Sequence, residues 1–204
     1  CFTILPMAYA IPCPSAISPP NAQRVYNSCG QYAVFQQNGL YGFSERHSGK
    51  VVVPAQYEAV FNYYANEHSP TAVKRKGKWG FVNMKGRVIV PFKYDTAQHF
   101  GYGGTPAIVS INGKWGMVGT QGQTVVPLNY ERMDGFNDNF AVACKSGKCG
   151  FFDHKGNQAI DLIYDDAGSF GNGIAPVKQN DKWGYIDTKG KTVIPFEYDQ
   201  AAPF

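Results

Sequence analysis

Acidic side chains recur at one position of this 204-residue chain, each directly after a tyrosine. The five acids are Glu58, Asp95, Glu131, Asp165 and Asp199. Two carboxylates held at a set distance can hydrolyse a glycosidic bond, so such acids are candidates for catalysis. Nothing in the sequence distinguishes one pair of them from the other three. We therefore expect a structural role, in which each carboxylate accepts hydrogen bonds from the amides of a turn.

Basic and imidazole side chains give two further candidate sites. Lysines recur before a Trp or Cys and before a turn glycine, at Lys78, Lys114, Lys148, Lys182 and at Lys85, Lys155, Lys189. Stacked repeats would align these lysines. The aligned lysines could bind a polyanion, or they could be solvated residues that keep strand edges from aggregating. The histidines His47, His68, His99 and His154 share no metal-ligand spacing. We predict no metal, no cofactor and no enzymatic activity.

Cysteines predict disulfides. If Cys1 is removed with a signal sequence, an even number remains. Cys144 and Cys149 flank a predicted hairpin turn, which brings facing residues within disulfide reach. Cys13 and Cys29 would form a second bridge. A four-cysteine metal site is the alternative, but no Cys-x-x-Cys pair exists. Disulfides are typical of an exported protein.

The elements that position these residues form a repeat. Gly-Lys-Trp-Gly, or Asp-Lys-Trp-Gly in the last copy, recurs at Trp79-Gly80, Trp115-Gly116 and Trp183-Gly184. The glycines that define the register are 34 to 38 residues apart, at Gly42, Gly80, Gly116, Gly150 and Gly184. In most repeats a proline stands eleven or twelve residues after the glycine, and the Tyr-acid pair begins three residues later. A phenylalanine ends each repeat, at Phe61, Phe100, Phe136, Phe170 and Phe204. Such a period indicates a repeat architecture.

Each repeat is predicted to contain about three short strands. Residues 78–83 alternate in polarity, and residues 87–90 are rich in β-branched side chains. We expect Pro91 to stop the second strand, with Tyr94 and Asp95 in a loop or bulge. Residues 107–109 would form the third strand. The glycine after each Trp indicates close backbone approach or a bulge.

These motifs resemble the WG-repeat, or KWG-repeat, family of mostly bacterial proteins. The resemblance covers about residue 31 to the end, with Tyr41 and Cys149 in place of two Trp residues. It implies an all-β binding protein, commonly exported, and supplies no catalytic residues. We expect five repeats of about 34 residues in a β-solenoid or superhelical stack. A closed propeller-like ring is the alternative.

The N-terminal region is predicted to be organised differently. Residues 1–10 are apolar and end in Ala8-Tyr9-Ala10, which resembles the end of a secretory signal. The alternatives are an ordinary strand and a lipid-modified Cys1. Residues 11–30 are proline-rich and would cap the first repeat, and residues 31–204 hold the repeats. We expect a bacterial periplasmic or cell-surface location, peripheral envelope association at most, and no transmembrane span.

Two loops that vary in length are the predicted binding sites. Residues 62–71 include Tyr63, Tyr64 and His68, and residues 101–106 include Tyr102. Equivalent loops of stacked repeats lie on one edge, and insertions there are often functional. Ordinary solvated loops are the alternative. We expect an exported, non-catalytic protein that contacts another envelope or secreted protein. Binding of a cell-envelope polysaccharide is the alternative, and nucleic acid is disfavoured by the export signal.

Overall fold

The computed structural model describes residues 15–26, 30–61 and 70–202, which form five sheets of four antiparallel strands each. We number the sheets 1 to 5 in chain order. Sheet 1 contains β1 (Arg24–Tyr26), β2 (Tyr32–Gln37), β3 (Leu40–Glu45) and β4 (Val51–Tyr57). Sheet 2 contains β5 (Ala59–Val60), β6 (Thr71–Arg75), β7 (Lys78–Val82) and β8 (Val88–Tyr94). Sheet 3 contains β9 (Thr96–Ala97), β10 (Ala107–Ile111), β11 (Lys114–Val118) and β12 (Thr124–Tyr130).

The last two sheets repeat the same plan. Sheet 4 contains β13 (Arg132–Met133), β14 (Phe140–Lys145), β15 (Lys148–Asp153) and β16 (Gln158–Tyr164). Sheet 5 contains β17 (Asp166–Ala167), β18 (Ile174–Gln179), β19 (Lys182–Asp187) and β20 (Thr192–Tyr198). A short 3-10 helix, η1 (Tyr102–Gly104), lies between β9 and β10.

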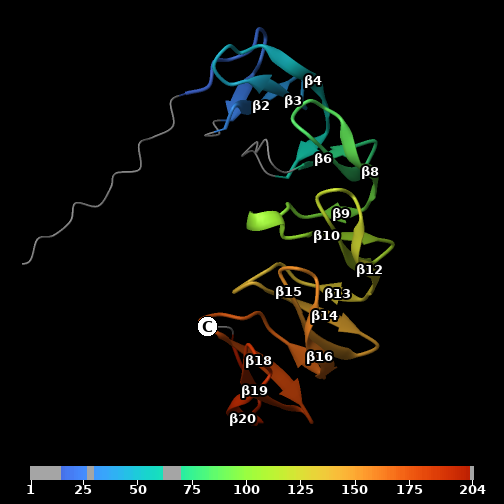
Figure 1. Ribbon diagram of the computed structural model, residues 1–204, viewed down its shortest axis with the longest axis vertical. Coiled ribbons are helices and arrows are strands. Elements are labelled where there is room, and N and C mark those ends of the chain that lie inside the picture. The colour runs from blue at the N-terminus through green and yellow to red at the C-terminus, as the bar shows by residue number, and fades with distance from the viewer. Residues whose placement is uncertain (1–14, 27–29, 62–69, 203–204) are drawn as a thin grey trace, which may run out of the picture.

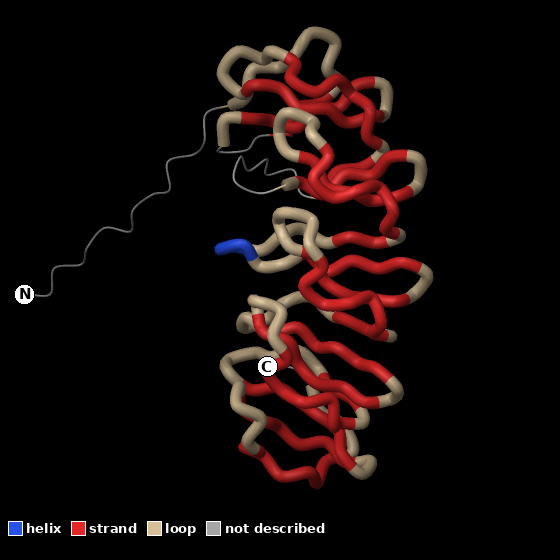
Figure 2. The backbone as a smooth tube through the Cα atoms, turned by 45° about the vertical axis from the view of Figure 1, so that its right-hand side comes forward, coloured by secondary structure: helices blue, strands red, loops and turns tan. Residues whose placement is uncertain are grey.

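The sheets follow one another in an open, curved stack, with sheets 1 and 5 at opposite ends (Figure 1). The tube in Figure 2 shows the same succession from a second direction. The predicted all-β stack of five repeats is therefore confirmed, and the described sheets do not close into a ring.

Each sheet has one strand more than the sequence analysis predicted. The additional strand is only two or three residues long, and in sheets 2 to 5 it comes from the end of the preceding repeat. Ala59–Val60, for example, follows the Tyr57-Glu58 pair of the first repeat but pairs with β6 of sheet 2. In sheet 1 the equivalent strand is β1, from the segment predicted to be a cap. One repeat therefore contributes strands to two successive sheets.

The expectation that Pro91 ends a strand was wrong. Strand β8 continues through Pro91 to Tyr94. Trp79 pairs with Tyr94 and Phe81 pairs with Val90, so an advance of two residues along β7 corresponds to four residues along β8. The extra residues form a bulge, where a proline is tolerated because no ladder hydrogen bond needs its missing N–H.

The bulge explains the glycine after the Trp. A Cβ added to Gly80 would lie 2.8 Å from the carbonyl oxygen of Val90. The equivalent distances from Gly116 to Val126 and from Gly150 to Ile160 are 2.5 Å. Real Cβ atoms do not approach so closely, and the predicted close backbone approach is confirmed.

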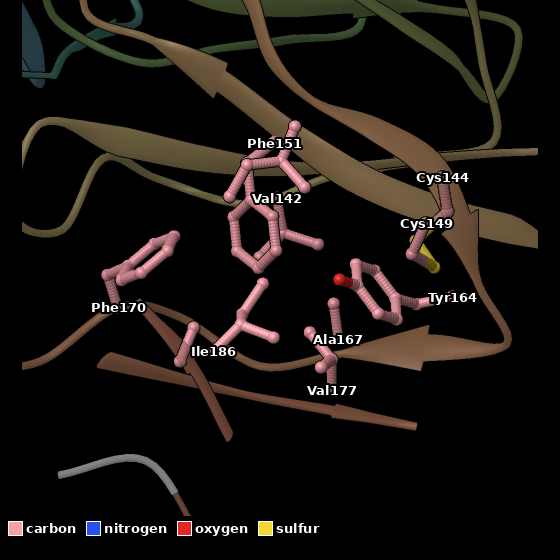
Figure 3. Packing of buried hydrophobic residues seen from close by; sticks show 11 residues of the cluster. Val142, Cys144, Cys149, Phe151, Tyr164, Ala167, Phe170, Val177 and Ile186 are labelled. Atoms are coloured by element: carbon pink, nitrogen blue, oxygen red, sulfur yellow. A yellow bond between two sulfur atoms is a disulfide. The ribbon is translucent and has the colours of Figure 1, made fainter. Parts of the chain in front are cut away.

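The hydrophobic core is divided among the four interfaces between successive sheets. Neighbouring residues of one strand point to opposite interfaces, so Val73 packs toward sheet 1 and Ala72 toward sheet 3. Figure 3 shows the interface between sheets 4 and 5, where Phe151 meets Phe170 with ring centroids 4.7 Å apart. Sheets 2, 3 and 4 thus bury both faces against neighbouring sheets, whereas sheets 1 and 5, at the ends of the stack, each have one neighbouring sheet.

Candidate functional site

The five repeated acids lie on the edge of the stack formed by the β-hairpin turns. The Oδ2 atom of Asp95 accepts a hydrogen bond of 2.7 Å from the backbone N–H of Asn112 in the next sheet, while Oδ1 pairs with Lys78 of its own sheet. Asp165 does the same with Asn180, at 2.9 Å, and with Lys148, at 2.6 Å. Glu58 likewise accepts from the N–H of Gly77, so three of the five acids bind a turn amide of the next sheet, as the sequence analysis expected of all five, and these three connect two sheets.

The electrostatics of these carboxylates follow from their partners. The hydrogen bond from Lys78 lowers the pKa of Asp95 below its ordinary value, with a further contribution from the Asn112 amide. The hydrogen bond from Lys148 likewise lowers the pKa of Asp165. Such groups stay ionised at neutral pH and have no proton to donate, which disfavours a role as general acids.

The repeated lysines before the Trp position are the partners of these acids. Lys114 lies 3.8 Å from Glu131, and Lys182 lies 2.6 Å from Asp199. Lysines of the second series occupy turns, where the amides of Lys155 and Lys189 donate to the preceding aspartates. The acids that would repel a polyanion therefore lie directly beside the first lysine series.

A polar cavity lies on the opposite edge, between sheets 3 and 4. Its volume is about 390 Å³. One wall is the connection from β9 to β10, with η1 beside it, and the other is the connection from β13 to β14 together with the turn between β15 and β16. The lining residues are Gln98, His99, Gly101, Thr105, Phe136, Asp138, Asn139 and His154.

Hydrogen bonds fix the backbone of the cavity walls. Asn137 and Phe140 exchange two backbone hydrogen bonds of 2.9 Å, which closes a two-residue turn around Asp138 and Asn139. Both turn residues have positive φ, 47° and 67°, as a type I′ turn requires. The carboxylate of Asp138 also accepts a 2.9 Å bond from the N–H of Gly173 in sheet 5.

The other two connections are equally constrained. The N–H of Gly101 donates to the carbonyl of Thr105 at 3.1 Å and closes the loop that contains η1. Next to His154, the Oδ1 of Asp153 accepts bonds from the amides of Lys155 and Asn157 at 2.8 and 2.9 Å. Partial burial raises the pKa of Asp153, but the hydrogen bond from the Asn157 side-chain amide, together with these two backbone bonds, brings the pKa below its ordinary value.

An exposed aromatic ring orients His99. Phe61, directly after β5, is 44% exposed, and its ring stacks on the His99 imidazole with centroids 5.6 Å apart. Phe61 was aligned with the phenylalanines that end the other repeats, but it follows its tyrosine by four positions instead of six. The buried Phe100 and Phe170 instead pack on Phe81 and Phe151.

The structure places only part of the predicted binding residues. Tyr63, Tyr64 and His68 lie outside the described residues, as do Cys13 and Cys29. Tyr102 begins η1 near the cavity, and its side chain is also outside the described part. The cavity brings His99 and His154 together, although they occupy different repeat positions. Gln98, Phe136, Asp138 and Asn139 were not predicted, and the positive φ that Asp-Asn favours was the available signal.

The framework residues occupy the hairpin side of the stack. Trp79, Trp115 and Trp183 are half-buried, and Trp79 and Trp115 each lie two residues before a buried residue of the same strand, Phe81 and Met117. In sheet 4 the predicted Cys144–Cys149 disulfide is present, with sulfurs 2.08 Å apart. Cys149 faces both Cys144 and Tyr164, at the position where Trp79 faces Lys74 and Tyr94. The bridge thus stands where sheets 2, 3 and 5 have a Trp and sheet 1 has Tyr41.

Two further observations concern all the described residues and not the cavity alone. They contain no cluster of three or more His, Cys, Asp or Glu side chains that could hold a metal ion. Within the same ranges, no helix has the length and apolar character that crossing a membrane requires.

Sequence comparison identifies the repeat. A family model described as "WG containing repeat" matches five consecutive segments, residues 41–78, 79–115, 115–149, 150–183 and 183–204. No match is found among curated proteins.

Solved structures resemble the chain only distantly. Hsv2 of Kluyveromyces lactis is 10% identical with a TM-score of 0.45, over 83% of this chain and 62% of that one. PorZ, a surface component of the type-IX secretion system of Porphyromonas gingivalis, is 9% identical with a TM-score of 0.40, over 88% and 28% of the two chains. The chain spans about three fifths of the Hsv2 structure. Similarity at this level says nothing about what the present chain binds.

Proposed function

This chain belongs to the WG-containing repeat family, and from that premise we propose that it is an exported, non-catalytic interaction protein. Its proposed partner is another protein of the cell envelope or a secreted protein. The contact surface is the loop edge, which we define as the edge that carries η1, the cavity and the turns around Asp138 and His154. The partner would bind across the connections of several successive sheets.

The main support for this proposal is that the two edges differ: the hairpin edge is regular from sheet to sheet, and the loop edge is not. On the hairpin edge, repeated residues such as Asp95 and Lys78 are bonded to each other and to the neighbouring sheet. On the loop edge the connections are less uniform: nine residues, including η1, lie between β9 and β10, but six lie between β13 and β14 and between β17 and β18. Irregular loops on a regular scaffold are the usual place for recognition in repeat proteins.

Two features support export and the absence of catalysis. The Cys144–Cys149 bond suits an oxidising compartment, in agreement with the signal-like N-terminal residues. Each repeated acid with a depressed pKa has a matching lysine and equivalent copies in other repeats, so no carboxylate pair is set apart for chemistry. Peripheral association with the envelope is compatible with both features.

A cell-envelope polysaccharide is the second candidate ligand. The cavity between sheets 3 and 4 favours it, because amide, imidazole, hydroxyl and carboxylate groups line it together with one phenyl ring. Protein hot spots, in contrast, are usually centred on aromatic or Arg anchors in water-excluded pockets.

Site-specific photo-crosslinking in the producing cells tests the proposed function. A photoreactive phenylalanine replaces Asn137 on the loop edge or, as the matched control, Lys76 on the hairpin edge; both positions are exposed. We expect one extracytoplasmic protein to be crosslinked from Asn137 and not from Lys76, and to bind again when both proteins are purified. Equal crosslinking from both positions, or a cytoplasmic location of the chain, would contradict the proposal.

A further inference from the structure

We propose that the cavity between sheets 3 and 4 is a binding site for an uncharged sugar unit of a glycan. This inference deepens the second candidate function, and it can fail while the protein-interaction proposal stands.

The volume and the lining together indicate a small polar ligand. About 390 Å³ lies near the lower end of the roughly 300–1,000 Å³ of small-molecule sites. Gln98 and Asn139 each offer an amide donor and a carbonyl acceptor, and His99 and His154 each offer a donor and an acceptor when neutral. Vicinal hydroxyl groups of a sugar are also donors and acceptors, so the two sets are complementary.

The apolar part of the lining fits the same ligand. Phe136 is the one phenyl ring among the lining residues, and it is half-buried in the connection between β13 and β14. A pyranose presents C–H groups on one face and hydroxyls around its rim. The C–H face of a pyranose can therefore pack on the phenyl ring of Phe136, while its hydroxyl groups bond to the polar side chains around that ring.

Charge argues against the other small ligands. No Lys or Arg lines the cavity, and Asp138 contributes a carboxylate, so phosphate or sulfate groups would be repelled. The described residues do not form a metal-binding cluster here. An apolar ligand would cover the amides of Gln98 and Asn139 and the two imidazoles without replacing their hydrogen bonds to water, which is costly.

The site is also pre-organised, which lowers the entropic cost of binding. The exchanged bonds of Asn137 and Phe140 fix the turn that presents Asp138 and Asn139. Stacking on Phe61 orients His99, and the bonds to Asp153 fix the turn that presents His154. All three segments that form the cavity, the β9–β10 and β13–β14 connections and the β15–β16 turn, therefore present their polar groups on constrained backbone.

Isothermal titration calorimetry with purified protein tests the inference. The probes are chitohexaose, maltohexaose and cellohexaose, with heparin as an anionic comparison. The binding variant is Gln98→Ala combined with His154→Ala. The matched control is His47→Ala, which removes an exposed turn histidine from sheet 1, away from the cavity.

We expect at least one neutral oligosaccharide to bind. The double variant should weaken that binding about tenfold or more, as the loss of two hydrogen bonds implies, while His47→Ala should leave it within about twofold. Phe61→Ala should weaken it less than the double variant, because Phe61 acts through His99. Circular dichroism spectra of all variants should match.

Three results would overturn the inference. They are no heat from any neutral probe, tighter binding of heparin than of the neutral probes, and binding that survives the double variant. If no sugar binds while the crosslinked protein partner still binds, the proposed interaction function stands and the sugar site does not.

Discussion

The glycine after each Trp is the residue whose identity the structure explains most directly. In Gly116 the missing side chain makes room for the bulge of β12, because a Cβ would lie 2.5 Å from the carbonyl oxygen of Val126 and 2.8 Å from Pro127. Both neighbours are backbone atoms of a paired strand, which cannot rotate away as a flexible side chain would.

We therefore predict that Gly116→Ala lowers the free energy of unfolding by about 2–4 kcal/mol, from steric strain in a packed strand. Urea denaturation followed by tryptophan fluorescence measures the change. The control is Gly135→Ala, whose new Cβ would lie 3.5 Å from Gln98 and should change stability by less than about 1 kcal/mol. Equal losses in both variants would contradict the steric explanation.

At the scale of the element, the hairpin of β14 and β15 differs from its counterparts. Cys144 and Cys149 are bonded there, whereas the hairpins of sheets 2 and 5 have a Lys and a Trp at the facing positions, Lys74 with Trp79 and Lys178 with Trp183. The bond closes a loop of only a few residues, so its stabilisation is at the modest end for disulfides.

Replacing both cysteines by serine should reduce the free energy of unfolding by about 2 kcal/mol, the loop-closure value for so short a loop. Restoring the repeat's own pair, with Cys144→Lys and Cys149→Trp, should recover at least half of that loss, because the other sheets accommodate a Trp at this position. Thermal melts under non-reducing conditions compare the three proteins. If the Lys–Trp protein melts below the double-serine protein, the Cys149 position is not equivalent to the Trp positions.

At the scale of the whole molecule, carboxylates on the hairpin edge connect successive sheets. Hydrogen bonds from Lys78 and Lys148 hold the pKa values of Asp95 and Asp165, which each connect two sheets, below the ordinary value of 3.8. Within sheet 5, Lys182 lowers the pKa of Asp199, and the amides of Lys191 and Lys189 lower that of Asp187 at the end of β19. A lowered pKa in the folded state means that ionisation favours folding. This contribution is complete above the unfolded-state pKa and is lost as pH falls through the lowered values.

The melting temperature should therefore be nearly constant between about pH 5 and 7 and should fall steeply below about pH 4, as these carboxylates are protonated. Melts recorded by circular dichroism from pH 7 to pH 2.5 measure this. A double variant, Asp95→Asn with Asp165→Asn, should melt lower at pH 7 and lose less on acidification. A melting temperature that stays constant down to pH 2.5 would show that these contacts do not stabilise the stack.

The same stack shows how far sequence reasoning reaches. Repeat length, strand polarity and the Cys144–Cys149 pairing depend on residues close together in the chain, and they were predicted correctly. The fourth strand was missed because Ala59–Val60 and its counterparts are two residues long and pair outside their own repeat. The path through Pro91 was missed because a bulge removes the need for the amide that proline lacks.

The sequence by itself determined an all-β array of five repeats, because period and alternation are local properties of the chain. Only the tertiary structure decided which residues of different repeats meet. It joined Asp95 to the turn of the next sheet, stacked Phe61 on His99, and brought His99 and His154 into one cavity. Those contacts depend on the rotation and spacing of whole sheets, which packing in the four interfaces sets and which no spacing along the chain encodes.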